Sequence, residues 1–295
     1  SSESALPGDN WSERCRDDFR RSFFALKKLA SEEVWLPQRW AEAFYAWSSD
    51  ELLERSWKHA SSVIVGMPDE HFVDALHAIA WWVSRISKHV EQHEEAFFTL
   101  VDRLIETGTK TVEASDDFSL NHALNHPVGH AASSLLNWWF SMELEDDQGL
   151  PDALKGRFAV MCNADNQPLW IGSVILAQQV IPLLRVDPDW TKEYLIPAFE
   201  WDADVTKAAA MWDSFLHAPR IYLPLLELLK SPFLAVPDHI DVLEEQCLNQ
   251  YSRFLTYIAL GEASVFSSKE LRDVFSKLPA KYLNTVTETL FRALQ

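Results

Sequence analysis

Apolar side chains recur at steps of three and four residues along most of this chain, and this spacing constrains the fold more than any other feature. The clearest run follows Pro68 and consists of Phe72, Leu76, Ile79, Val83 and Ile86. An α-helix brings such positions onto one face, which is stable when a neighbouring helix buries it. A second run, from Leu243 to Ile258, ends in front of Gly261, as helices often do. The spacing predicts helices packed on helices.

Helix starts are marked as well as helix faces. Asn10 precedes Glu13 by three residues, which is the spacing of a capping box, and an apolar face then runs from Cys15 to Ala30. We expect one helix there. Only 8 of the 295 residues are glycine, too few for the turns that many short strands need. We therefore expect an all-α fold of about a dozen helices, with no strand.

One internal similarity indicates how the helices are arranged. Trp170 followed by Pro182-Leu183-Leu184 recurs 42 residues later as Trp212 followed by Pro224-Leu225-Leu226. Paired-helix repeats of the HEAT or armadillo type have about this period. Proline inside a helix bends its axis, so we expect two similarly kinked helices in successive repeats. The prediction is a right-handed α-solenoid of irregular helix pairs, and a chance match of these few residues is the alternative.

The chain is expected to form a single elongated helical domain over residues 1–295. The helix that carries Phe97 and Leu104 is predicted to end at Gly108. The polar segment that begins there, 107–119, is the best candidate for a hinge.

The charge of the chain excludes one class of partner. Its formal net charge is −18, and more than half of this lies between residues 61 and 160. Such a charge repels phosphate backbones, and no basic run is longer than Arg20-Arg21 or Lys27-Lys28. We therefore do not expect the protein to bind nucleic acid, although an acidic decoy that imitates nucleic acid is a weaker alternative.

Cysteine usage and hydropathy favour a cytoplasmic protein. The three cysteines, Cys15, Cys162 and Cys247, are far apart and have no CxxC spacing, so we expect them to be reduced core residues. The first residues show no basic segment followed by an apolar one. The most apolar run, 169–184, is interrupted by Gln178-Gln179. We expect neither secretion nor a membrane span.

Two groups of histidines invite a metal hypothesis. His89 and His93 are four apart on a predicted helix, but Val90 stands where a zinc protease needs glutamate. The second group is His122, His126 and His130, also four apart. Pro127 interrupts the helix that would align these three residues, and it predicts a helix start directly after His126. Neither group has a third ligand that the sequence places, so we expect a solvated polar face for the first, a structural role for the second, and no metal.

Catalytic signatures are also missing from the sequence. The acidic pairs Asp17-Asp18, Asp116-Asp117 and Asp146-Asp147 lie in no DDxxD frame, and there is no GxSxG and no glycine-rich phosphate loop. We predict no cofactor and no catalysis. The alternative is an all-helical enzyme with an acidic, tryptophan-lined pocket, acting for example on carbohydrate or diphosphate substrates.

Two pairs of adjacent tryptophans allow a prediction of which helix faces are buried. Consecutive side chains on a helix point about 100° apart, so one ring of Trp81-Trp82 and one of Trp138-Trp139 should be buried and the other half-exposed. Clustered exposed aromatic rings are typical anchors of protein interfaces. A helix packed on two sides is the alternative explanation for these pairs, and it is the one we favour.

Residues 120–295 contain short motifs rich in proline and aromatic residues. They are His126-Pro127-Val128-Gly129, Leu135-Leu136 with Trp138, the run from Val186 to Trp201, Trp212, Phe215-Leu216, Pro219-Arg220-Ile221-Tyr222 and Pro224-Leu225-Leu226. This string resembles the helical C-terminal region of bacterial anti-phage defence proteins whose N-terminal part is a sirtuin-like NADase. The chain departs from the full architecture because it has no glycine-rich NAD-binding segment.

The resemblance implies a sensing or regulatory role rather than catalysis. The partner would be an NADase effector, located elsewhere in the same protein or complex, or a phage protein. Rigid aromatic residues along a concave helical face would form the interaction surface, and the candidates are Trp190, Trp201, Trp212 and Tyr222. We therefore expect a non-catalytic helical module that binds another protein.

Overall fold

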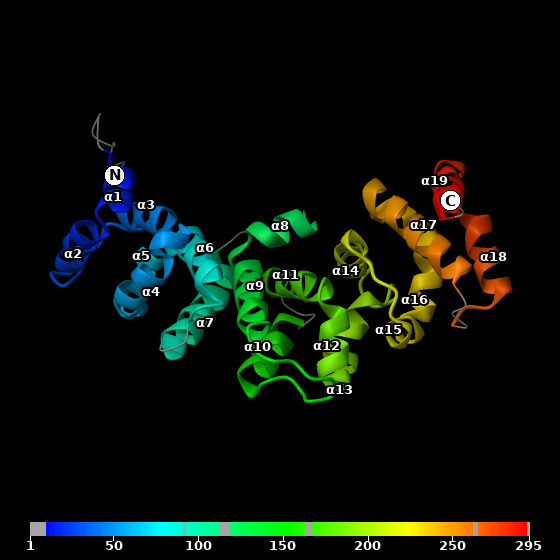
Figure 1. The fold of residues 1–295 in the computed structure, drawn as a ribbon, viewed down its shortest axis with the longest axis horizontal. Coiled ribbons are helices and arrows are strands. Elements are labelled where there is room, and N and C mark those ends of the chain that lie inside the picture. Colours follow the sequence, from blue (N-terminus) through cyan, green and yellow to red (C-terminus); the bar gives the residue numbers. More distant parts are fainter. Residues whose placement is uncertain (1–9, 91–92, 112–117, 163–166, 262–264, 294–295) are drawn as a thin grey trace. The chain divides into compact units, whose positions relative to one another are not determined.

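The computed structural model describes residues 10–90, 93–111, 118–162, 167–261 and 265–293, and these residues are almost entirely helical (Figure 1). They form helices α1 to α19, with short π and 3₁₀ turns and no strand in the described ranges. The predicted all-α class is confirmed. The helices are more numerous than the predicted dozen because several apolar runs are divided by a break.

The chain divides into two compact units, each of which is described by itself. Unit 1 comprises Ser1–Ala114 and Leu124–Glu143, and unit 2 comprises Ser115–Ala123 and Leu144–Gln295. The first boundary falls inside the predicted hinge 107–119. Helix α7 nevertheless continues through Gly108 to Thr111, so the expected helix end at Gly108 is wrong. Gly108 serves close packing instead, because a Cβ there would lie 3.1 Å from Cβ of Pro127.

The helices of unit 1 form two rows. Their bounds are α1 Trp11–Asp17, α2 Phe19–Ala30, α3 Pro37–Trp47, α4 Asp50–Val65, α5 Asp69–Asp74, α6 Leu76–Ile86, α7 Glu94–Thr111 and α9 Pro127–Trp139. In one row α1 contacts α3, α3 contacts α6, and α6 contacts α9. In the other α2 contacts α4, and α4 contacts α7, which also packs on α6 and α9. Helix α8, Leu120–Asn125, spans the boundary between the units.

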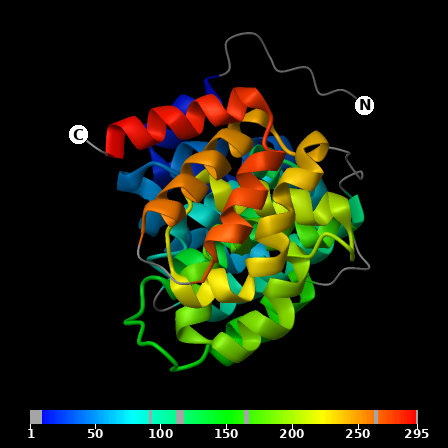
Figure 2. The same cartoon turned by 90° about the vertical axis from the view of Figure 1, so that its right-hand side faces the viewer.

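Unit 2 has a similar row of long helices with shorter segments beside it. The bounds are α10 Asp152–Cys162, α11 Gln167–Ala177, α12 Val180–Val186, α13 Pro188–Trp190, the π turn η2 Thr191–Leu195, the 3₁₀ turn η3 Ile196–Phe199, α14 Val205–His217, α15 Leu223–Leu228, α16 Lys230–Ala235, η4 Val236–Val242, α17 Glu245–Leu260, α18 Ser268–Lys277 and α19 Ala280–Ala293. Successive contacts join α10, α11, α14, α17 and α19. Figure 2 shows α17 and α19 side by side at the C-terminal end of this row.

Polar residues divide the predicted helices. The expected helix from Asn10 to Ala30 is in fact two, α1 and α2, because Asp18 leaves the helical conformation and its carboxylate accepts a hydrogen bond from the backbone N–H of Arg21 (3.0 Å). The apolar run after Pro68 is buried as predicted, although it is shared between α5 and α6. Tertiary burial therefore follows the apolar spacing even where the helix does not continue.

The repeated prolines lie in the first turns of new helices, so a break between two helices replaces the predicted kink within one helix. Pro182 lies in the first turn of α12 and Pro224 in the first turn of α15. Pro182 has no N–H to donate to the carbonyl of Gln178, so α11 cannot continue through this point. The axes of α11 and α12 meet at 80°. Among the described residues, no single helix is long and apolar enough to cross a membrane, and this bent pair meets the length and composition criteria only when taken together.

Aromatic side chains form the core of each unit. In unit 1, ring contacts run from Phe19 through Trp47, Phe44, Trp82, Trp57, Phe97 and Phe98 to Trp138. Trp82 is fully buried while Trp81 is 42% exposed, as predicted for adjacent positions. Trp138 and Trp139 are both buried, which corrects the prediction for that pair, because α9 packs on α6 and α7 at once.

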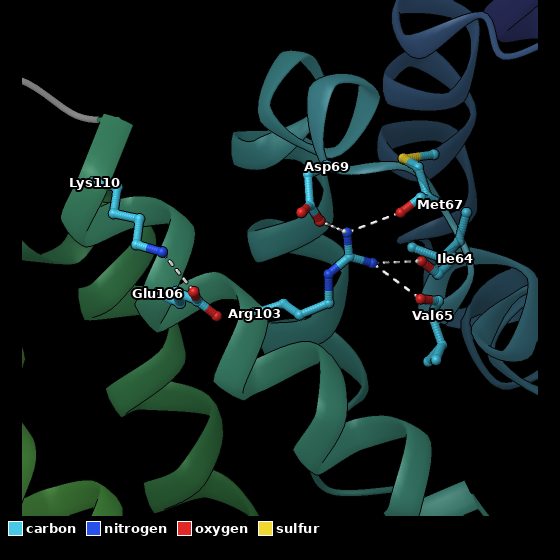
Figure 3. Close-up of polar contacts among 7 residues, drawn as sticks. All are labelled: Ile64, Val65, Met67, Asp69, Arg103, Glu106 and Lys110. Carbon is cyan, nitrogen blue, oxygen red and sulfur yellow. Dashed lines mark hydrogen bonds and ion pairs between the residues drawn. The ribbon is translucent and has the colours of Figure 1, made fainter.

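An arginine joins three segments of unit 1. The guanidinium of Arg103, on α7, donates hydrogen bonds to the carbonyls of Ile64 (3.3 Å), Val65 (3.0 Å) and Met67 (2.8 Å), which lie at and just beyond the end of α4 (Figure 3). It also binds the Asp69 carboxylate at 2.8 Å, where α5 begins. The last carbonyls of a helix have no partner within that helix, so Arg103 acts as the C-terminal cap of α4.

We predict that Arg103→Met lowers the free energy of unfolding by about 2 to 3 kcal/mol, because the variant keeps the apolar stem and loses the charged hydrogen bonds to the α4 end. The measurement is the midpoint of chemical denaturation. Lys110→Met is the matched control on the same helix, because Lys110 pairs with Glu106 at an exposed position (Figure 3). This substitution should cause no measurable change in the midpoint. Equal midpoints for Arg103→Met and the wild type would contradict the capping role.

Candidate functional site

Three of the four predicted surface anchors belong to the core of unit 2. Trp190, Trp201 and Trp212 are all buried. The indole N–H of Trp201 donates to the Pro232 carbonyl (2.8 Å), and that of Trp212 donates to the Phe199 carbonyl (3.1 Å). Trp190 packs its ring against Phe158 and Tyr194. All three tryptophans thus hold segments of unit 2 together, and they are not the exposed anchors that the motifs predicted.

Tyr222, the fourth predicted anchor, is half-buried and lines a cavity of about 260 Å³. We name it the Tyr222 cavity. Its walls come from the loop before α10, from α12, α13 and η2, and from α15 with the residue before it. The lining residues are Asp146, Asp147, Leu184, Arg185, Pro188, Lys192, Tyr222, Pro224, Glu227 and Leu228. All of them belong to unit 2.

The acidic side of this cavity is a loop that α12 holds in place. The N–H of Asp147 donates to the Arg185 carbonyl and that of Gly149 to the Val186 carbonyl, both at 2.8 Å. The carboxylate of Asp146 pairs with the guanidinium of Arg185 at 2.8 Å. Asp147 has φ 61°, a left-handed conformation that aspartate tolerates better than most residues. The loop is therefore anchored on both sides of Asp147, and that residue is presented at the cavity.

Asp187 holds the C-terminal end of the same loop. Its carboxylate accepts hydrogen bonds from the N–H groups of Leu150 (2.9 Å) and Trp190 (3.1 Å), and it pairs with Lys155 at 3.1 Å. Burial by itself raises the pKa of Asp187, but the two backbone hydrogen bonds and Lys155 outweigh burial and lower it. The residue also caps α13, because its side chain accepts a hydrogen bond from the backbone N–H of Trp190. One charged carboxylate thus fixes the loop relative to α13.

The rim of the Tyr222 cavity combines charged and apolar groups. Arg185 is neutralised by Asp146, whereas Asp147, Glu227 and Lys192 form no ion pair with any residue that the structure describes. Beside Tyr222, the apolar side chains of Ile221 and Leu223 are 48% and 43% exposed. Exposed apolar and aromatic groups with polar residues around them are typical of surfaces that bind other proteins.

A second cavity in unit 2, of about 330 Å³, has a different character. It is lined by Phe118, Ser119, Thr206, Ala209, Ala210, Asp213, Val242 and Glu244, and we name it the Asp213 cavity. The ring of Phe118 lies 4.7 Å from that of Trp170. Oδ1 of Asp213 is buried and has no hydrogen-bond partner among the described residues. Burial raises the pKa of Asp213 to about 6, although hydrogen bonds from the Cys247 side chain and the Glu244 backbone lower it.

The histidines that suggested a metal are separated by the structure. Helix α6 ends at Ile86 and α7 begins at Glu94, so the predicted helix bearing both His89 and His93 does not form. His126 directly precedes α9, and its Nδ1 accepts a hydrogen bond from the N–H of Val128 (3.1 Å), which confirms the predicted helix start at Pro127. Over the described ranges, no three His, Cys, Asp or Glu side chains are placed to hold a metal ion.

The acidic pairs also have separate roles. Asp18 caps α2, and Asp146-Asp147 belong to the Tyr222 cavity, whereas Asp116-Asp117 lie outside the described residues. Sequence reasoning missed the buried carboxylates of Asp187 and Asp213. Only the position of Asp187 before Pro188 signals its capping role, and Asp213 carries no such signal.

Comparison of the chain with protein-family models, curated proteins and solved structures finds no match. The resemblance to sirtuin-linked defence proteins therefore stays a prediction from the motifs alone. The two cavities and their charges are the basis for what the protein is proposed to do.

We predict that Asp213 makes the folded protein less stable as pH rises from about 4 to about 6. Its folded pKa is raised above the unfolded value near 4, so between these values the folded state binds more protons and loses stability as they dissociate. The loss of unfolding free energy should be roughly 3 kcal/mol in total. Urea unfolding at a series of pH values measures this loss of stability. In Asp213→Asn, the loss between about pH 4 and about pH 6 should disappear. Identical pH profiles for the variant and the wild type would refute this assignment.

Proposed function

We propose that this protein is a non-catalytic helical module that binds another protein at the Tyr222 cavity and the apolar residues beside it. The observation that supports this most directly is the placement of Tyr222, half-buried at a cavity whose acidic loop is fixed by α12 and Asp187. A preformed rim loses little conformational entropy on binding. Tyrosine adds a large contact area with a polar tip, which makes it a frequent interface anchor.

The proposed architecture around this surface is a stack of helix pairs of the HEAT or armadillo type. Trp170 lies on α11 and Trp212 on α14, two helices in contact, and each is followed by a helix that begins near a proline. A further step of 42 residues leads to Phe254, a buried residue of α17, which contacts α14. Equivalent aromatic positions on successive contacting helices are what a repeat of paired helices produces.

The proposed biological role is that of a sensor or regulator in a bacterial anti-phage defence system. It rests on the resemblance of residues 120–295 to the helical part of sirtuin-linked defence proteins. In this role the partner is an NADase effector or a phage protein. The net charge of −18 favours a partner with a basic surface, because opposite charges accelerate encounter and like charges oppose it.

We predict that Tyr222→Ala weakens a complex with such a partner by about thirtyfold, on the order of 2 kcal/mol, without lowering the melting temperature. The partner is sought by co-purification with the products of neighbouring genes, and affinity is measured by calorimetry. Tyr257→Ala is the matched control, because Tyr257 is similarly large, is 48% exposed on α17, and does not line the cavity. Equal effects of the two substitutions would argue against the Tyr222 surface.

An enzyme remains the second candidate, and the Asp213 cavity is the observation that favours it. It brings together Asp213, with its raised pKa, and Glu244, and two carboxylates in different environments are the usual means of acid–base catalysis. The walls hold Phe118 rather than a tryptophan, which differs from the tryptophan-lined pocket that the sequence suggested.

We predict that the isolated chain does not hydrolyse NAD, since the sequence has no glycine-rich phosphate cradle. Turnover is measured by release of nicotinamide, and chromogenic glycosides and an allylic diphosphate are assayed in parallel. Activity toward any of these compounds that both Asp213→Asn and Glu244→Gln remove would favour the enzyme over the binding module.

A further inference from the structure

We propose that the Tyr222 cavity receives an arginine side chain of the partner protein. This inference rests on the proposed function, because it specifies the chemistry of the partner at the same site. The occupant is identified by the size of the cavity, by the charges at its rim and by the surfaces of its walls.

The size of the cavity suits one side chain. Its volume of about 260 Å³ lies below the range of roughly 300 to 1,000 Å³ that is usual for sites of drug-sized ligands. A single long side chain presented by another protein fits a space of this size, while the exposed Ile221 and Leu223 contact the surrounding surface of that protein.

The charges at the rim favour a cation. Arg185 and Asp146 neutralise each other through two contacts, at 2.8 and 3.3 Å, which leaves Asp147 and Glu227 as carboxylates without an ion-pair partner in the described chain. Lys192 adds one positive charge to these two negative charges, so the rim has a net negative charge. A single exposed ion pair contributes little, but two carboxylates arranged around one guanidinium, together with an aromatic contact, make a specific site.

The walls favour arginine over lysine. Tyr222 presents an aromatic ring, and Pro188 and Pro224 present rigid apolar surfaces. A guanidinium is planar and weakly hydrated, so it stacks on such surfaces while its edge donates hydrogen bonds to carboxylates. An ammonium group is a compact, strongly hydrated charge and loses more on leaving water.

The test uses the full chain labelled with 3-fluorotyrosine, with the Tyr222 resonance assigned from Tyr222→Phe. The probe is N-acetylarginine amide, and N-acetylcitrulline amide is the neutral control of nearly the same shape. We expect a saturable shift of the Tyr222 resonance with arginine, with a Kd of about 1 mM, and a much smaller one with citrulline. Nα-acetyllysine amide, whose side-chain ammonium is free, should bind more weakly than the arginine probe.

The charge assignment is tested by variants of the rim. Asp147→Asn with Glu227→Gln should weaken binding of the arginine probe about tenfold, whereas Asp273→Asn with Glu288→Gln, an exposed pair outside the cavity, should leave it unchanged. Lys192→Gln should bind the probe at least as tightly as the wild type, because it removes a like charge. Weaker binding of the arginine probe to Lys192→Gln than to the wild type would contradict this charge assignment and overturn the proposal.

The outcomes separate this inference from the proposed function. Equal shifts with arginine and citrulline, or no shift with either, would refute the arginine site. If Tyr222→Ala still weakens the protein complex in that case, the proposed binding surface is supported and only the assignment of arginine as its occupant is refuted.

Discussion

Both units of this protein depend on aromatic rings that pack between successive helices. Phe44, Trp82 and Trp57 connect α3, α6 and α4 through ring centroids 4.8 and 5.0 Å apart. In unit 2, the ring of Trp212 contacts those of Phe199 and Phe233. Many helices here have fewer residues than an isolated helix needs in water, so their stability comes from this burial. The abundance of tryptophan thus serves the core more than the surface.

Short helices create many ends, and polar side chains satisfy the backbone groups there. Arg103 binds the last carbonyls of α4, while Asp18, Asp187 and Asp204 accept hydrogen bonds from the first N–H groups of α2, α13 and α14. Asp187 has a further effect, because it also binds the N–H of Leu150 and so holds the loop that carries Asp147. A structural cap therefore also determines where the acidic rim of the Tyr222 cavity lies.

The two cavities of unit 2 suit different chemistry. The Tyr222 cavity has charges and apolar groups at an open rim, which suits contact with another protein. The Asp213 cavity contains a carboxylate whose burial raises its pKa and disfavours its charged form. Carboxyl groups with perturbed pKa values often lie at functional sites. The two sites share no lining residue, so substitutions test them independently.

The all-α class, the buried stripe from Phe72 to Ile86 and the helix starts at Pro127 and Pro188 were determined by the sequence, because apolar spacing, caps and proline act over a few neighbouring residues. Only the tertiary structure decided that α7 continues through Gly108, which gives Pro127 room to approach. It also decided that Trp190, Trp201 and Trp212 are buried while Tyr222 lines a cavity. All four lie in similar motifs, and the exposure of each ring depends on which distant segments cover it, information that the periodicity of one helix does not contain.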